Sequence, residues 1–160
     1  MKAASIKEIK QELADVSPIR LLELAMRLAK FKKENKELLT YLLFEAHDEQ
    51  SYVAGIKETL HLMFTEVNVK SLYITKKNLR KIIRTANRFI KYSSDPLTEV
   101  EIVIYICEEI KQLGIDLRKS TSLQNIYTSQ LKRTEKNILM LHEDLQYDYL
   151  KKYKNLADGK

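Results

Sequence analysis

The sequence is poor in the residues that punctuate or cross-link a fold. Its 160 residues include one cysteine, two prolines, three glycines and no tryptophan. The single Cys107 cannot form an internal disulfide, which disfavours a secreted disulfide framework. The apolar runs are too short to span a bilayer, and the polar N-terminus lacks the apolar core of a signal peptide. By elimination, we expect a cytoplasmic protein that does not enter a membrane.

The scarcity of glycine and proline also disfavours a sheet protein, because sheets need many turn residues. Leu, Lys, Glu, Ile and Ala are abundant instead, and most of these are good helix formers. A length of 160 residues is that of one ordinary domain, which needs no metal or disulfide in order to fold. We therefore predict an all-α fold in a single domain spanning residues 1–160.

Helix-capping signals divide the chain into about seven helices. Ser5 with Glu8 has the pattern of a capping box, and Ser17-Pro18 places a cap before a proline at the first helical position. The same cap-then-proline signal precedes residue 96. The predicted helices cover about residues 5–14, 17–31, 35–46, 48–67, 71–92, 96–113 and 120–156. The last of these is longer than an average helix.

Two of the predicted helices, 17–31 and 35–46, are apolar around most of their circumference. Such helices are normally covered on more than one side, so we expect neighbours on several faces of each. Gly55 lies inside helix 48–67, where glycine costs about 1 kcal/mol relative to alanine. We expect a close helix crossing at this glycine.

The run 100–106 is rich in β-branched residues, which favour strands. Capping signals flank this run, and its polar residues keep helical spacing. No other segment of the chain offers a partner strand. We therefore predict that 100–106 is helical.

Short links between the helices imply antiparallel neighbours. Two architectures fit: a stack of helical hairpins that forms an α-α superhelix of the HEAT or armadillo type, and a compact helical bundle. No clear sequence repeat is present, although a solenoid normally has one. The apolar helices 17–31 and 35–46 favour the stack slightly.

One segment concentrates positive charge. Between Val67 and Ser94 there are eight basic residues and no acidic one, whereas the rest of the chain has 20 basic and 22 acidic residues. Most of the basic residues recur every three or four positions on helix 71–92, opposite its apolar face. We name these positions the basic stripe; they are Lys76, Lys77, Arg80, Lys81, Arg84, Arg88 and Lys91.

Two interpretations of the basic stripe are open. It could bind nucleic-acid phosphates, with exposed aromatic residues at 73, 89 and 92 stacking on bases. It could instead be a solvated face whose charge is neutralised by helix 96–113, through Glu99, Glu101, Glu108 and Glu109. The second interpretation is slightly favoured on the sequence. A smaller basic cluster at Arg27, Lys30, Lys32, Lys33 and Lys36 could extend the first.

Catalytic and metal-binding motifs are weak or missing. Glu58-x-x-His61 has the spacing of one half of a helical di-iron site, but the second half is absent. There is no glycine-rich phosphate loop, nucleophile elbow or cysteine pair. Cys107 lies in an apolar stripe and is interpreted as a buried hydrophobic residue. We predict no catalytic residue, no metal ligand and no cofactor.

Two segments, 28–44 (LAKFKKENKELLTYLLF) and 76–84 (KKNLRKIIR), resemble an uncharacterised family of small all-helical bacterial proteins. The resemblance implies a helical fold, with a HEAT-like arrangement as one form of it, and no assigned activity. Some HEAT-like proteins act on alkylated DNA and hold the damaged base on aromatic surfaces that include tryptophan. The absence of tryptophan here disfavours such an activity.

Three functions remain as hypotheses. The first is a non-catalytic helical scaffold that binds a protein partner, including a homodimer formed through the tyrosine- and lysine-rich C-terminal helix. The second is nucleic-acid binding through helix 71–92. The third is an enzyme whose site is not visible in the sequence.

Overall fold

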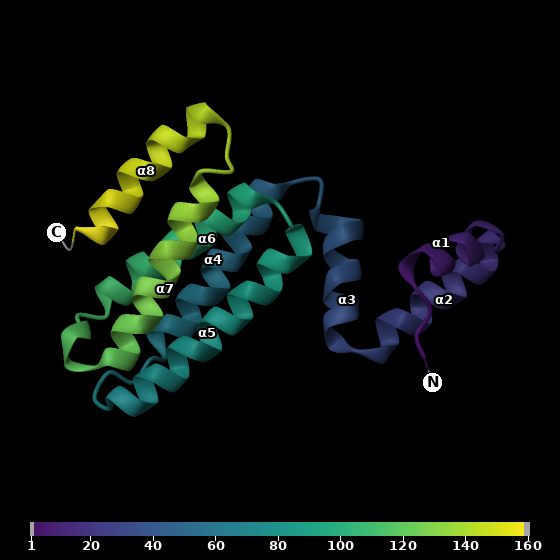
Figure 1. Ribbon diagram of the computed structural model, residues 1–160. Helices are drawn as coiled ribbons and strands as arrows, with labels where there is room; N and C mark the ends of the chain where they lie inside the picture. Colours follow the sequence, from purple (N-terminus) through teal and green to yellow (C-terminus); the bar gives the residue numbers. More distant parts are fainter. Residues whose placement is uncertain (1, 159–160) are drawn as a thin grey trace. The chain divides into compact units, whose positions relative to one another are not determined.

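The computed structural model describes residues 2–158 and contains no strand within them. The prediction of an all-α fold is confirmed (Figure 1). The sequence predicted one domain, whereas the backbone divides into two compact units, Met1–Phe44 and Glu45–Lys160.

The first unit contains three α-helices, α1 (Ile6–Ala14), α2 (Pro18–Phe31) and α3 (Lys33–Thr40). The predicted caps are present. The Ser5 hydroxyl accepts a hydrogen bond from the Glu8 backbone N–H at 3.3 Å, and the Glu8 carboxylate accepts one from the Ser5 N–H at 2.7 Å. The Ser17 hydroxyl caps α2, whose first residue is Pro18. These local interactions explain why both helices begin where the sequence predicts.

The predicted covering of the apolar helices is wrong for the first unit. No residue of α1, α2 or α3 is buried. Ile19, Leu22 and Phe31 are 75%, 64% and 75% exposed. The reason is that α2 packs mainly against α3, and three short helices cannot enclose all the apolar faces that they carry.

The third helix is also shorter than predicted. The α-helical geometry ends at Thr40, and a π-helical turn, η1 (Tyr41–Glu45), continues the chain toward the second unit. Tyr41 is buried, whereas Leu42, Leu43 and Phe44 are more than half exposed. The continuous helix 35–46 that the sequence predicted is therefore divided between two helical forms.

The second unit holds the main core and contains five α-helices and a short 3₁₀ turn. Their bounds are α4 (Glu49–Thr65), α5 (Leu72–Ser93), α6 (Pro96–Gln112), η2 (Leu117–Lys119), α7 (Thr121–Ile138) and α8 (Glu143–Ala157). Consecutive helices pack against each other, and α6 contacts all four other α-helices of the unit (Figure 1). A central helix of this kind differs from a linear stack of hairpins, so the HEAT-like arrangement is not confirmed.

The central position of α6 accounts for its β-branched composition. The Asp95 carboxylate caps its N-terminus, and the run 100–106 is helical as predicted. Val100, Ile102 and Val103 are fully buried although they point in different directions around the helix. A helix that is covered along run 100–106 by several neighbours needs apolar residues in several directions, which is the feature that resembled a strand in the sequence.

The long C-terminal helix predicted for residues 120–156 is wrong, because the chain turns at 139–142 and forms two packed helices, α7 and α8. The Gln146 side-chain amide donates to the Leu141 carbonyl at 2.8 Å and so satisfies a backbone acceptor in the turn. The Tyr127 hydroxyl donates to the Leu156 carbonyl at 3.0 Å and ties the end of α8 to α7. Tyr149 and Leu156 are buried on the folded-back helix.

The predicted helix crossing at Gly55 is also wrong. Gly55 is exposed, and a Cβ atom added there would meet no atom within 4 Å. In the described part of the chain, none of the helices has the length and apolar character needed to cross a bilayer.

Candidate nucleic-acid interface

The basic stripe lies on α5, whose two faces differ sharply in polarity. Leu79, Ile82, Ala86 and Ile90 are buried in the core of the second unit. The start of the helix is held by Thr75, whose hydroxyl lies 2.8 Å from the Asn68 carbonyl and 2.9 Å from the Ser71 carbonyl. With the apolar face anchored, helical spacing directs most basic side chains outward.

The structure exposes five of the seven stripe residues: Lys77, Arg80, Lys81, Arg84 and Lys91. Lys76 and Arg88 are half-buried. The guanidinium of Arg88 lies 5.3 Å from the centre of the Phe89 ring. Arg88 is therefore not part of the freely exposed stripe that the sequence predicted.

The acidic residues of α6 do not neutralise the basic stripe. Glu99 forms an ion pair with Arg133 at 2.6 Å, and it also accepts a hydrogen bond from the Asn137 amide. Glu101 forms an ion pair with Lys57 at 2.7 Å and accepts a hydrogen bond from the Tyr149 hydroxyl at 2.7 Å. Both carboxylates are thus committed to cations and donors outside α5.

The remaining two acidic residues of α6 are also directed elsewhere. Glu109 is buried, and its carboxylate lies 3.4 Å from Nδ1 of His61 on α4. Glu108 is exposed and forms no ion pair within the described part of the chain. Among the described residues of the second unit, 45–158, no carboxylate lies within 4.0 Å of the charged groups of Lys76, Lys77, Arg80, Lys81, Arg84 or Lys91.

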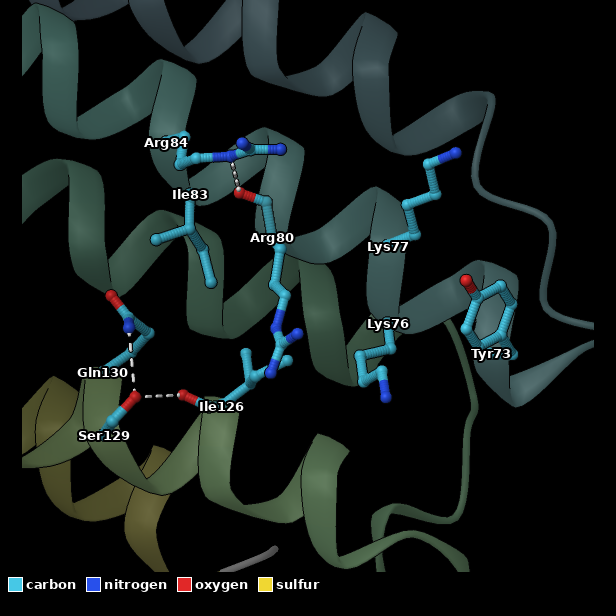
Figure 2. Close-up of a pocket in the computed structure, with 9 residues that line it drawn as sticks. All are labelled: Tyr73, Lys76, Lys77, Arg80, Ile83, Arg84, Ile126, Ser129 and Gln130. Carbon is cyan, nitrogen blue, oxygen red and sulfur yellow. Dashed lines mark hydrogen bonds between the residues drawn. The ribbon is translucent and has the colours of Figure 1, made fainter.

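An open groove of about 640 Å³ separates part of this stripe from α7 (Figure 2). We name it the α5–α7 groove. One wall is the first half of α5 and the other is the middle of α7. In Figure 2 the side chains of Lys76 and Arg80 extend toward α7. The lining residues are Tyr73, Lys76, Lys77, Arg80, Ile83, Arg84, Ile126, Ser129 and Gln130.

The two walls of the groove differ in charge. The α5 wall carries four cations, whereas the α7 wall is uncharged and consists of Ile126, Ser129 and Gln130. The Ser129 hydroxyl donates to the Ile126 carbonyl at 2.7 Å, and the Gln130 amide donates to Ser129 at 3.2 Å. The ligand that fits such a groove has anionic groups on one side and a neutral surface on the other.

One exposed aromatic ring stands at the end of the groove. Tyr73 is 72% exposed, and the ammonium of Lys76 lies 5.7 Å from its ring centre. The other two aromatic residues considered from the sequence are unsuited to stacking on a ligand. Tyr92 is buried, and its ring packs edge-on against half-buried Phe89.

The sequence located the cationic wall but missed the opposite one. Ser129 and Gln130 are ordinary helix residues in the sequence, and only the packing of α7 beside α5 brings them to the groove. The smaller basic cluster at 27–36 belongs to the first unit. Lys81 and Lys91 lie on α5 but outside the groove lining.

Metal and thiol chemistry find no support in the described residues. Among residues 2–158 there is no group of three or more His, Cys, Asp or Glu side chains that could hold a metal ion. Burial raises the pKa of the Cys107 thiol to about 12, so the nucleophilic thiolate is scarce at neutral pH.

No family model, no curated protein and no solved structure matches the chain. The resemblance to an uncharacterised bacterial family therefore stays a prediction.

Proposed function

We propose that this chain is a non-catalytic protein that binds the phosphate backbone of nucleic acid in the α5–α7 groove. The observation that carries this proposal is the set of four groove cations, which have no carboxylate of the described residues 45–158 within 4.0 Å, beside a helix whose Glu99 and Glu101 are paired elsewhere. Neutralisation of the stripe by α6 is less well supported, because Glu99 and Glu101 are paired outside α5.

Electrostatics gives the reason why such a cluster favours an anion. Arg80 and Arg84 are one turn apart, and like charges at this spacing destabilise an isolated helix by a few tenths of a kcal/mol. A phosphate bound between them adds two attractions that offset this repulsion. The arginine guanidinium also offers paired N–H donors that match the oxygens of a phosphate group.

The direct test is fluorescence anisotropy with labelled single-stranded and double-stranded oligonucleotides at several salt concentrations. Four phosphate contacts predict that affinity falls roughly 50-fold for a single strand, or roughly 150-fold for a duplex, between 50 and 200 mM salt. If neither ligand binds at 50 mM salt, the proposal is wrong.

A double charge reversal, Arg80→Glu with Arg84→Glu, should abolish this binding while leaving the helical circular-dichroism spectrum unchanged. The matched control is Lys151→Glu with Lys154→Glu, which changes the net charge equally on exposed positions of α8. Binding that survives the first double variant, or that is lost equally in the control, would show that the groove is not the binding site.

A protein-interaction scaffold is the second candidate, and the first unit supports it. Twelve large apolar side chains between residues 6 and 44 are exposed, including Ile6 at 81% and Phe44 at 68%. Exposed apolar surface of this density is typical of interaction sites. In this candidate function, the chain binds a protein partner or a second copy of itself held through α8, as the sequence suggested. The cytoplasmic location predicted from the sequence belongs to the same proposal.

A further inference from the structure

We propose that the α5–α7 groove selects a single strand of nucleic acid over a duplex, with one base stacked on Tyr73 and the adjoining phosphates held by the α5 cations. This inference rests on the proposed function and names the class of nucleic acid that the same groove takes. It follows from the position of one aromatic ring, the unequal walls and the size of the groove.

The exposed ring of Tyr73 supports stacking of a base. An aromatic side chain that is 72% exposed forgoes the burial that such residues normally obtain, and this one lines the groove together with four cations. The ammonium of Lys76 lies 5.7 Å from the ring centre. A base stacked on the ring would therefore have its own phosphate within reach of a cation.

The two walls of the groove differ in a way that favours a single strand. The cations all come from α5, whereas the α7 wall offers Ile126 and two neutral polar side chains. A single strand can turn its phosphates to one wall and its bases to the other. A duplex hides its bases inside and presents phosphates along both strands. An uncharged wall therefore offers a duplex few favourable contacts.

The size of the α5–α7 groove also fits a single strand. A volume of about 640 Å³ is typical of pockets that enclose a small molecule, which range over roughly 300–1,000 Å³. From Tyr73 to Arg84 the helix rises about 16 Å, at 1.5 Å per residue. This length accommodates a few nucleotides of one strand.

The test compares one mixed-sequence 12-nucleotide strand, labelled with fluorescein, with the same strand annealed to its complement, by anisotropy at constant salt. The wild-type protein should bind the single strand about 10-fold more tightly than the duplex, as expected for one stacked base. Unlabelled AMP is added as a competitor, because a free nucleotide shares the chemistry of a base with a phosphate.

Two tyrosine variants isolate stacking from charge. Tyr73→Ala should weaken single-strand binding about 10-fold and leave the weaker duplex binding within twofold, whereas Tyr73→Phe should retain both. Tyr147→Ala is the control, because Tyr147 is 75% exposed and lies on α8, outside the groove.

The outcomes separate this inference from the proposed function. Loss of all binding in the Arg80→Glu, Arg84→Glu variant would support the proposed function. If Tyr73→Ala then had no effect on binding of the single strand, the inference about strand selection would be overturned while the proposed function stood. Equal affinity of the wild-type protein for strand and duplex would do the same. If AMP competes at the same concentration as the oligonucleotide, the groove binds a free nucleotide and the inference of a single strand is wrong. Absence of binding to either oligonucleotide would remove the proposed function itself.

Discussion

At the scale of single residues, the carboxylates of α6 control where positive charge is left uncompensated. Glu99 holds Arg133 on α7, and Glu101 holds Lys57 on α4. Each of these half-buried pairs ties two helices together and keeps a carboxylate away from the basic stripe. The positive charge of the stripe therefore stays uncompensated because these carboxylates form ion pairs with other residues.

Glu101 provides a prediction about pH. Burial raises the pKa of Glu101, but hydrogen bonds from Lys57 and Tyr149 outweigh this effect, and the pKa lies below its usual value of 4.5. A carboxyl group with a lowered pKa stabilises the fold above the pKa of the unfolded chain, and this contribution is lost as the pH falls through the lower, folded pKa. We expect Glu101→Gln to be less stable than the wild type at pH 7, with a difference that shrinks below about pH 4.5.

The measurement is urea unfolding of both proteins at pH values between 7 and 3. Glu108→Gln on the same helix is the control, since Glu108 is exposed and should show little difference at any pH. A Glu101→Gln deficit of the same size at pH 7 and pH 3 would mean that the ionised carboxylate is not the stabilising species.

At the scale of elements, helix ends and helix faces are decided by different interactions. The caps of α1, α2 and α6 involve residues no more than three positions apart, and the sequence located all three. The turn between α7 and α8 depends instead on contacts such as that of Tyr127 with Leu156, which are 29 residues apart. Local patterns could not reveal that turn.

Gly55 gives a prediction for α4. Because a Cβ atom at this position meets nothing within 4 Å, Gly55→Ala should raise the free energy of unfolding by up to about 1 kcal/mol, the helix-propensity difference. Gly114→Ala is the matched control. Its site is equally open, but its φ of +65° disfavours alanine, so that variant should be destabilised. Urea unfolding measures both. Destabilisation by Gly55→Ala would indicate a crossing at this glycine after all.

Leu156 gives a prediction for α8. Its side chain is only 6% exposed, so Leu156→Ala should cost about 2–5 kcal/mol and increase amide hydrogen exchange throughout α8. Leu145→Ala on the same helix removes the same atoms from a position that is 37% exposed and should cost much less. Equal effects of the two variants would show that α8 is not anchored through its C-terminal end.

At the scale of the whole molecule, the two units differ in how they satisfy their apolar residues. The second unit buries its apolar residues around α6, whereas the first unit has no buried residue in its three α-helices. A segment of about 40 residues seldom folds alone without a disulfide, a metal or association with another chain. This difference is the physical basis of the scaffold candidate.

The corresponding prediction concerns association. Analytical ultracentrifugation of the wild-type protein at high concentration should show self-association, and Ile19→Ser with Leu22→Ser should reduce it, because these exposed residues lie one turn apart on α2. Leu139→Ser with Met140→Ser is the control, with similarly exposed apolar residues in the second unit. A monomeric wild-type protein would exclude self-association as the role of the first unit.

The sequence by itself determined the all-helical class, the helix starts at Ser5, Ser17 and Asp95, and the basic face of α5. Each of these depends on residues within one or two turns of the same helix, so the interactions that create them are visible in the order of the residues. The preference of β-branched residues for strands also explains why the run 100–106 of α6 was ambiguous until its capping signals were considered.

Only the tertiary structure decided the break before α8, the exposure of α2, the neutral wall of the groove and the pairing of the α6 carboxylates. The ion pair of Glu99 with Arg133 and the hydrogen bond of Glu101 with Tyr149 join residues 34 and 48 positions apart. Contacts at such separations depend on which helix faces meet. That choice is made by packing a whole core, so no local pattern in the sequence encodes it.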